Sequence, residues 1–360
     1  MLSFGVALWF REGCGIECFS MHQVFTLIIM ALVVGALGFR HRRSIRQSCS
    51  QYASLFYNDI YEVPLPAGHR FPMEKYRKVR TTLQSEFIAG VSFIESPLAT
   101  VDELATTHCR NYIQRFLTGE GMTAAEVRAV GFPWSVPGTK RALSSVGGTV
   151  AAMRAVLNGE SRASGHIAGG THHAFFDYGE GFCVFSDIAV AANLALVEYS
   201  ARVRKIVIID LDVHQGNGNA KLFEKQPAVF TFSMHCAANL FSKKEVSDVD
   251  VEIEAGTGDA EYLKILNGWL PFLFDVVKPD LVFFQAGVDP FAGDRLGRLA
   301  LTRDGLRERN SLVYEYVKSR NVPLVVTMGG GYPKSEHPAE WLEVIECHSD
   351  CYRQMIKVFA

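Results

Sequence analysis

Three unbroken apolar runs constrain the fold of this chain more than any other feature: Lys205–Asp212, Asp280–Ala286 and Val322–Met328. An apolar run without polar alternation is typical of a strand that is buried on both faces of a parallel sheet. Helical stretches near residues 259–276 and 303–320 separate these runs in a β-α-β rhythm. The sequence therefore predicts an α/β fold with a central, mostly parallel sheet and helices on both faces.

Polar or glycine-rich residues end each of the three runs. Asp210, Asp212 and His214 end the first, and because side chains alternate along a strand we expect them to point to one side. Asp289 follows the second run, and Gly329–Tyr332 follows the third. Ligands of such sheets bind beyond the carboxyl ends of the strands, and buried carboxylates are costly unless they are paired or bind a metal. The spacing predicts a divalent-metal site at this edge.

The adjacent pair His172-His173 would add proton-transfer groups to such a site, and the combination indicates a metal-dependent hydrolase. The composition is globular, with 48% hydrophobic and 21% charged residues. The net charge is −2 and the isoelectric point about 6.6, which gives no basic face. We therefore expect no direct binding to nucleic acid.

The eight cysteines include no CxxC pair. Cys14 and Cys18 are spaced by four residues, as are Cys347 and Cys351, and the second pair brackets His348. We interpret these cysteines as reduced thiols of an intracellular protein rather than as ligands of a zinc knuckle.

The amino-terminal region differs from the rest of the chain. Residues 24–39 are nearly all apolar, and the basic stretch Arg40–Arg43 follows them. Three interpretations stay open: a membrane anchor that leaves the next domain on the cytoplasmic side, an organelle transit segment, or a leader without a targeting role. We divide the chain into a leader, residues 1–53, and a single domain, residues 54–360. The leader would allow membrane association or an organelle location.

Further helices are expected in four places. One begins near Met73, after a proline-rich extended segment. A second covers Thr123–Ala129 with Thr123 as its N-cap, and a third covers Gly147–Leu157. A long apolar helix is expected over residues 183–201, with Ser186 or Asp187 as its N-cap.

Four blocks carry a family resemblance: residues 169–192 (GGTHHAFFDYGEGFCVFSDIAVAA), 206–220 (IVIIDLDVHQGNGNA), 285–302 (QAGVDPFAGDRLGRLALT) and 328–332 (MGGGY). In these blocks the chain resembles the zinc-dependent histone deacetylase superfamily, from about Tyr57 to the carboxyl end. The resemblance implies an arginase/deacetylase-like catalytic domain. The segments AGDRLGRLALT and PLPAGHRFPMEKY are more similar to the class IV and bacterial-type branches than to class I.

The resemblance also implies an activity, the zinc-dependent hydrolysis of N-acyl-lysine amides. The substrates would be histones or other proteins, with a role in chromatin regulation and an intracellular location. Asp212, His214 and Asp289 fall on the zinc ligands of the family. His172 and His173 fall on its active-site pair, in which His173 accepts a proton from the attacking water and His172 stabilises charge.

Other residues match the supporting groups of that site. Asp210 falls on the carboxylate that orients the first histidine of the pair, and Asn217 on the partner of the second. Tyr332 falls on the tyrosine that donates to the oxyanion. Gly181 and Phe182 fall on the segment that lines the acyl-lysine channel. The resemblance further implies a potassium ion, held at Asp210, Asp212, His214, Ser233 and Met234.

Other functions stay open. An acetylpolyamine amidohydrolase or a long-chain fatty deacylase would use the same catalytic groups. A catalytically inactive scaffold would bind acyl-lysine only, and a binuclear manganese ureohydrolase would need more Asp and His ligands at the strand ends. We interpret His108 and His235 as structural residues, and Arg295 and Arg298 as solvated or paired loop charges.

Overall fold

A ten-stranded sheet forms the centre of the computed structural model, in the order β2-β1-β8-β7-β6-β9-β10-β5-β3-β4. The eight strands from β3 to β10 are all parallel, as predicted. The structure describes residues 8–12, 15–18, 53–87, 90–239 and 241–359. The strands are β1 Leu8–Glu12, β2 Gly15–Cys18, β3 Ala53–Tyr57, β4 Val91–Glu95, β5 Ala163–Ile167, β6 Ile206–Asp210, β7 Val229–Cys236, β8 Val249–Ile253, β9 Leu281–Gln285 and β10 Leu324–Thr327.

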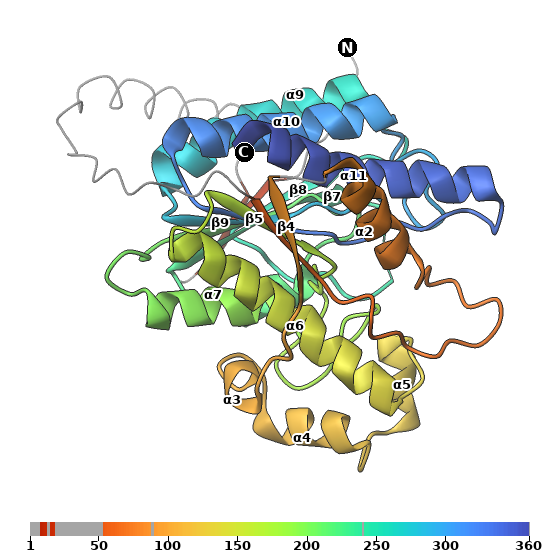
Figure 1. The fold of residues 1–360 in the computed structure, drawn as a ribbon. Coiled ribbons are helices and arrows are strands. Elements are labelled where there is room, and N and C mark those ends of the chain that lie inside the picture. Colours follow the sequence, from red (N-terminus) through yellow and green to blue (C-terminus); the bar gives the residue numbers. More distant parts are fainter. Residues whose placement is uncertain (1–7, 13–14, 19–52, 88–89, 240, 360) are drawn as a thin grey trace.

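Helices cover both faces of this sheet (Figure 1), which confirms the predicted layers. The helices α2, α9, α10 and α11 lie over one face, α6 and α7 lie over the other, and α3, α4 and α5 form a small group beside α6. A π-helical turn, η1, continues α9. The helices are α2 Lys75–Glu86, α3 Val101–Leu104, α4 Arg110–Thr118, α5 Ala124–Val130, α6 Val136–Leu157, α7 Asp187–Glu198, α8 Asn217–Leu222, α9 Asp259–Pro271, η1 Phe272–Val277, α10 Arg303–Arg320 and α11 Pro338–Phe359.

Two hydrophobic cores explain the unbroken apolar runs. In β6, Val207 and Ile209 belong to the core under α9, α10 and α11, whereas Ile206 and Ile208 belong to the core under α6 and α7. Alternate residues of β6 are therefore buried on opposite faces, so Ile206–Ile209 are apolar on both sides.

Part of the predicted leader extends the sheet. The strand β1 pairs antiparallel with β8 and with β2. The apolar segment 24–39 lies outside the described residues, so the membrane and transit interpretations stay predictions. Within the ranges that the structure describes, no helix is both long and apolar enough to cross a membrane.

The predicted helices exist, but some bounds differ. The predicted N-caps are confirmed: the Thr123 side chain accepts from the Glu126 N–H at the start of α5, and the Ser186 side chain accepts from the Ala189 N–H in α7. The helix predicted over 183–201 begins only at Asp187, because the preceding segment turns toward the site.

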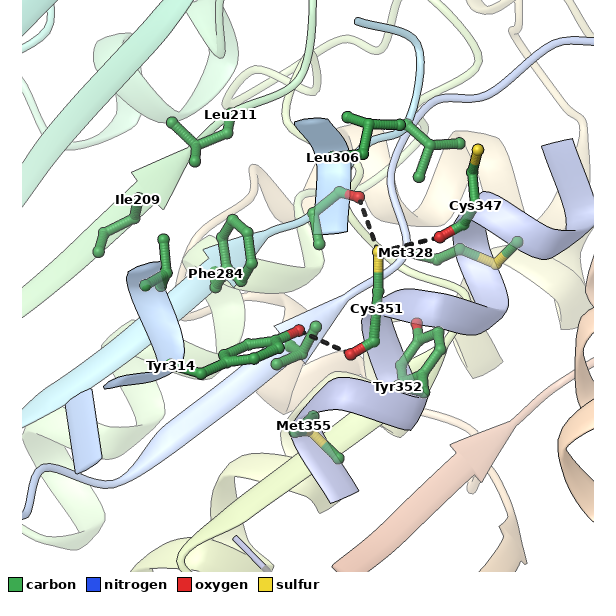
Figure 2. Packing of buried hydrophobic residues seen from close by; sticks show 14 of the residues in the cluster. Ile209, Leu211, Phe284, Leu306, Tyr314, Met328, Cys347, Cys351, Tyr352 and Met355 are labelled. Carbon is green, nitrogen blue, oxygen red and sulfur yellow. Dashed lines mark hydrogen bonds between the residues drawn. The ribbon is translucent and has the colours of Figure 1, made fainter. Parts of the chain in front are cut away.

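The helix α11 was not predicted from the sequence. Its cysteines at positions 347 and 351 are both buried, one helical turn apart, and are free thiols. Figure 2 shows Cys351 packed among Tyr314, Met328 and Tyr352, with its backbone carbonyl accepting from the Tyr314 hydroxyl at 2.9 Å. The two side chains thus pack in the core as free thiols, and the reduced, intracellular state stays a prediction.

Candidate metal centre and active site

Four neighbouring strands, in the order β6-β9-β10-β5, bring the predicted site residues to one edge of the sheet. The loop after β6 carries Asp212 and His214, and the loop after β9 carries Asp289. The loop after β10 carries Tyr332, and the loop after β5 carries the pair His172-His173. Residues up to 160 positions apart in the sequence (172 to 332) thus meet at one place because parallel strands end at the same edge.

Asp212, His214 and Asp289 form a compact cluster whose candidate ligand atoms all lie within 4.8 Å of one another. The Nδ1 atom of His214 lies 3.3 Å from Oδ1 of Asp212 and 3.3 Å from Oδ2 of Asp289. Ligands arranged tetrahedrally at zinc bonds of about 2.0–2.1 Å would lie about 3.3–3.4 Å apart. Two carboxylates and one imidazole are also the donor set of a catalytic zinc site that keeps a position for water or substrate.

The surroundings of this cluster fit a bound cation. Within the described part of the chain, the buried Oδ2 atom of Asp289 accepts no hydrogen bond. Burial and the charge of Asp212 raise the pKa of Asp289 to about 7, and a cation between the carboxylates would relieve this repulsion. Glycines close the site: a Cβ atom at Gly287 would lie 2.2 Å from Oδ2 of Asp212, and one at Gly330 2.2 Å from Oδ2 of Asp289.

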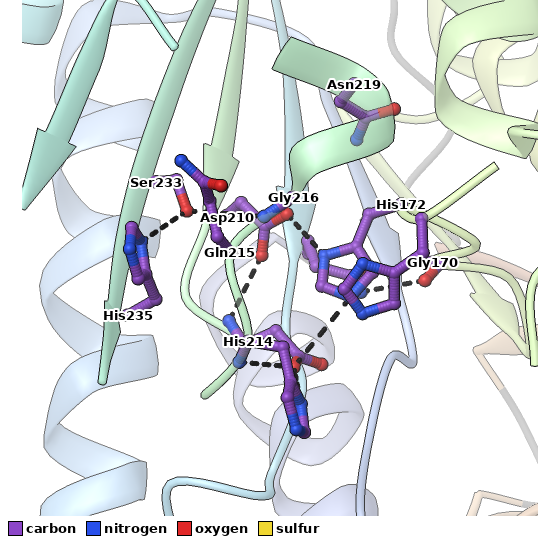
Figure 3. A network of polar contacts seen from close by, with 12 residues as sticks. Gly170, His172, Asp210, His214, Gln215, Gly216, Asn219, Ser233 and His235 are labelled. Carbon is purple, nitrogen blue, oxygen red and sulfur yellow. Dashed lines mark hydrogen bonds and ion pairs between the residues drawn. The ribbon is translucent and has the colours of Figure 1, made fainter. Parts of the chain in front are cut away.

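The two histidines of the pair are buried and face different partners. The Nδ1 atom of His172 lies 2.7 Å from Oδ2 of Asp210 (Figure 3), and Nδ1 of His173 lies 2.7 Å from Oδ1 of Asn217. Burial alone lowers the pKa of His172, but the negative charges beside it, that of Asp210 foremost, raise this pKa to about 9. Burial and the charge of His172 lower the pKa of His173 well below its usual value. These opposite pKa shifts favour a charged ring at His172 and a neutral ring at His173.

Asp187, at the start of α7, anchors the loop that carries this pair. Its carboxylate accepts hydrogen bonds from the backbone N–H groups of Gly170 (3.0 Å) and Thr171 (2.7 Å). The hydroxyl of Thr149 also donates to it at 2.6 Å. The sequence pattern indicated Asp187 only as a helix cap, so this anchoring role was missed.

Tyr332 is positioned through its backbone. Its N–H donates to Oδ2 of Asp294 at 2.6 Å, and its carbonyl accepts from the Arg295 N–H at 2.8 Å. Burial and the charge of Asp289 raise the pKa of the Tyr332 hydroxyl well above its usual value, so it stays protonated and can donate. Asp294 lies in the block that carries the resemblance, but the sequence did not assign it a role.

Two buried cations, also missed, hold the loops around the site. The Nζ atom of Lys75 donates to the carbonyls of Gly329 and Gly331, each at 3.2 Å, directly beneath the tyrosine turn. Burial lowers the pKa of Lys75 to about 8. Arg309, from α10, donates to the carbonyl of Gly287 at 2.6 Å. A lysine or arginine in an amphipathic helix gives no sequence signal for such burial.

An aromatic-walled passage leads from the surface to this cluster. A cavity of about 300 Å³ is lined by Phe182, Phe241 and Tyr332 and reaches His173 and His214. Phe241, 50% exposed, was missed because it stands alone beside a mixed-charge stretch.

The wall formed by Gly181 and Phe182 has an unusual backbone. Both residues adopt left-handed φ values, +57° and +68°, and Phe182 is one of three non-glycine residues with a positive φ in the described part of the chain. Their N–H groups donate to the carbonyls of Ala129 and Val130 at the end of α5, at 3.0 and 2.8 Å. These hydrogen bonds hold a conformation that a phenylalanine would otherwise avoid.

The remaining predicted residues lie at the neighbouring ends of β6 and β7. Asp210 pairs in register with Ser233, whose hydroxyl lies 3.0 Å from Nδ1 of His235 (Figure 3). Met234 follows in β7. The potassium site at this place stays a prediction. His235 and His108 are both buried in hydrogen-bonded positions, in agreement with structural roles.

Comparisons with known proteins agree with this geometry. The sequence matches the Histone deacetylase domain family over residues 69–347. It is 40% identical over 282 residues to an uncharacterized protein of Picosynechococcus sp., which covers 78% of this chain and 92% of that protein. It is 30% identical over 294 residues to Histone deacetylase 2 of Arabidopsis thaliana (78% and 75% covered). It is 28% identical over 299 residues to the histone deacetylase-like amidohydrolase of Pseudomonas aeruginosa (79% and 77% covered).

These relatives do not single out the class IV branch, so that assignment stays a prediction. The family match covers more than half of the chain and includes all the strands that carry the site. The parallel sheet and the Asp-His-Asp cluster are those expected of the family. The chain therefore belongs to the histone deacetylase domain family and is a metal-dependent amidohydrolase.

Proposed function

We propose that this protein hydrolyses N-acyl-lysine amides in peptides or proteins, histones among the candidate substrates, with zinc as its metal. One observation carries the proposal: the passage lined by Phe182 and Phe241 ends at His173 and His214, beside a second cavity that Asp212 and Tyr332 line. A linear acyl-lysine side chain fits such a passage, with its amide at the inner end.

Asp212, His214 and Asp289 would hold the zinc ion. When bound, it supplies a Lewis acid that polarises the amide carbonyl and lowers the pKa of water. The hydrogen bonds from the Val213 N–H to Asp289 (2.9 Å) and from the Gly330 N–H to Asp212 (2.8 Å) fix the two carboxylates in advance.

The two histidines divide the proton-transfer work. His173 is neutral, and its Nδ1 faces the oxygen of Asn217, so its Nε2 lone pair is free to accept the proton of the attacking water. The same proton can then pass to the leaving lysine amine. His172, held cationic by Asp210, orients the water and stabilises negative charge, because it has no lone pair left to act as a base.

Tyr332 would donate its hydroxyl proton in a hydrogen bond to the developing oxyanion. A donor of this kind is typically worth about 3–4 kcal/mol of activation free energy. The raised pKa of the hydroxyl ensures that the donor keeps its proton at neutral pH.

The mouth of the passage favours peptides over polyamines. Arg70 and Arg298 both line it and are exposed. Among the described residues, neither guanidinium forms an ion pair, which makes both solvated rather than paired charges. A cationic acetylpolyamine would meet like charge here, whereas a peptide with acidic residues beside the acyl-lysine would be attracted.

A side-by-side assay tests the proposal. The zinc-loaded full chain is given an acetyl-lysine peptide, a fatty-acyl-lysine peptide and an acetylpolyamine at equal concentrations. We expect the highest kcat/KM on one of the two peptides. A clear preference for the acetylpolyamine, or no hydrolysis of any of the three by protein with stoichiometric zinc, would overturn it.

A further inference from the structure

The side-chain amide of Asn217 has an orientation that its neighbours determine. Its Oδ1 accepts from the backbone N–H of Gly218 at 3.0 Å and faces Nδ1 of His173 at 2.7 Å. Its Nδ2 donates to Oε1 of Glu180 at 2.8 Å and to the carbonyl of Lys243 at 3.2 Å. Because a backbone N–H only donates, while a carboxylate and a carbonyl only accept, the oxygen of the amide must face His173.

This orientation determines which nitrogen of His173 carries the proton. The Nδ1 atom faces an acceptor, so the neutral ring places its hydrogen on Nδ1 and its lone pair on Nε2. If the amide were reversed, its NH₂ group would face Nδ1 and the hydrogen would move to Nε2. A ring in that second tautomer could not accept a proton from water on the substrate side.

Glu180 is built into this chain of hydrogen bonds. Its Oε2 accepts from the Ser242 hydroxyl at 2.9 Å, so both carboxylate oxygens have donors. It directly precedes the Gly181-Phe182 turn that walls the passage. The side chain is half-buried and lies between the Asn217 amide and the Ser242 hydroxyl.

We propose that Glu180 is a positioning residue, which fixes the tautomer of His173 through the amide of Asn217. This inference rests on the proposed function, because the tautomer matters only if His173 accepts a proton during hydrolysis. The role of Glu180 also explains why the two histidines differ in how a carboxylate reaches them. The carboxylate of Asp210 touches His172 directly, whereas the carboxylate of Glu180 reaches His173 only through a neutral amide. The two rings therefore differ in the group that faces Nδ1, a carboxylate at His172 and a neutral amide at His173.

A cycle of four proteins tests the inference: wild type, Glu180→Gln, Asn217→Asp and the double variant. Glutamine can still accept from the Asn217 amide, so Glu180→Gln alone should lower kcat only about two- to fivefold, with KM unchanged. Asn217→Asp places two carboxylates at hydrogen-bond distance and should lower kcat about tenfold or more. In that background Glu180→Gln supplies an amide donor to the new carboxylate and should raise kcat about tenfold.

The change of sign is the decisive result, because a residue with a merely structural role would do the same harm in both backgrounds. Asp177→Asn serves as the matched control, since it removes a charge from an exposed position of the same loop, three residues from Glu180. We expect its kcat to equal that of the wild type. If Glu180→Gln lowers kcat by the same factor with and without Asn217→Asp, the inference is wrong.

A spectroscopic measurement separates this inference from the proposed function. Nitrogen-15 NMR of the histidine-labelled, zinc-loaded protein reports the tautomer of His173, assigned by comparison with His173→Gln. The wild type should show protonated Nδ1, and Glu180→Ala should show a mixture of tautomers. A wild-type ring protonated on Nε2, or a Glu180→Ala spectrum identical to that of the wild type, would overturn the inference even if every substrate is hydrolysed. An inactive protein with the expected spectra would count only against the proposed function.

Discussion

The backbone N–H of Gly330 donates a hydrogen bond to Oδ2 of Asp212 at 2.8 Å, across 118 residues of sequence. The turn that carries Tyr332 is thereby tied to a carboxylate of the metal cluster. Under the proposed function, this one short contact couples metal binding to the position of the Tyr332 hydroxyl, so a change at one end should alter the other.

Gly330→Ala should weaken zinc binding about 10- to 100-fold, because the new Cβ would lie 2.2 Å from Oδ2 of Asp289. Competition with a chromophoric chelator measures the zinc affinity. Gly268→Ala is the matched control, since a Cβ there has no described atom within 4 Å. Equal zinc affinity in Gly330→Ala and the wild type would show that the loop moves away without cost.

Tyr332→Phe should lower kcat about 10²- to 10³-fold while one zinc ion stays bound per chain. The hydrogen bonds that place this residue come from its backbone, to Asp294 and from Arg295, so the turn should survive loss of the hydroxyl. Turnover and zinc content are measured on the same sample. Full activity in this variant would remove the hydroxyl from the mechanism.

His108 should make folding stability depend on pH. Its Nδ1 donates to the Phe175 carbonyl (2.8 Å) and its Nε2 accepts from the Ser186 N–H (2.9 Å), so the neutral ring is required. Burial lowers its pKa from 6.5 to about 4. Between these values the unfolded chain binds a proton that the folded chain does not, so stability is lost as pH falls from about 6.5 toward 4.

Urea unfolding at pH 7 and pH 5 measures this contribution. The loss of unfolding free energy on going to pH 5 should be smaller in His108→Gln than in the wild type. The exposed His337→Gln serves as the control and should keep the wild-type difference. An unchanged difference in His108→Gln would mean that the pH dependence comes from other groups.

Reversal of charge at the mouth should change substrate preference. The double variant Arg70→Glu/Arg298→Glu should raise kcat/KM for an acetylpolyamine relative to an acidic acetyl-lysine peptide by about tenfold or more at low salt, and less at high salt. The exposed Arg128→Glu on α5 lies outside the cavity lining and is the control. If Arg128→Glu has the same effect, net charge and not the mouth determines the preference.

The place of the Asp-His-Asp cluster could be predicted from the sequence because its residues follow strands that are buried on both faces, whereas their choice as candidate ligands came from the family resemblance. The strand β5 could not be predicted from the sequence, although the loop that carries His172 and His173 follows it. Gly165 interrupts its apolar pattern, but a Cβ there would lie 2.8 Å from atoms of both Leu55 and Tyr352. His166 also breaks the apolar pattern, and its buried ring forms a hydrogen bond with the Ser96 hydroxyl. This packing depends on residues far away in the sequence, so the sequence of β5 alone does not indicate it.

The amino-terminal half of α6 was missed for a related reason. Arg141 lies on a face that would be expected to contact solvent, yet its guanidinium is buried over the Tyr76 ring and donates to Asn58. The buried Lys75 is the first residue of α2, a helix whose other buried residues follow an ordinary amphipathic pattern. Long cationic side chains can be buried when a tertiary contact satisfies them, and this contact depends on residues distant in sequence.

The hydrogen bond from Phe182 to α5 means that the shape of the passage and the chemistry depend on different parts of the fold. The chemistry depends on strand ends that can hardly change without loss of the fold. The wall of the passage depends on Ala129 and Val130, in a small helical group at the periphery. Under the proposed function, substitutions in that group would widen or narrow the passage without altering Asp212, His214 or Asp289, so acyl-chain preference would be free to change while the hydrolytic centre stays the same.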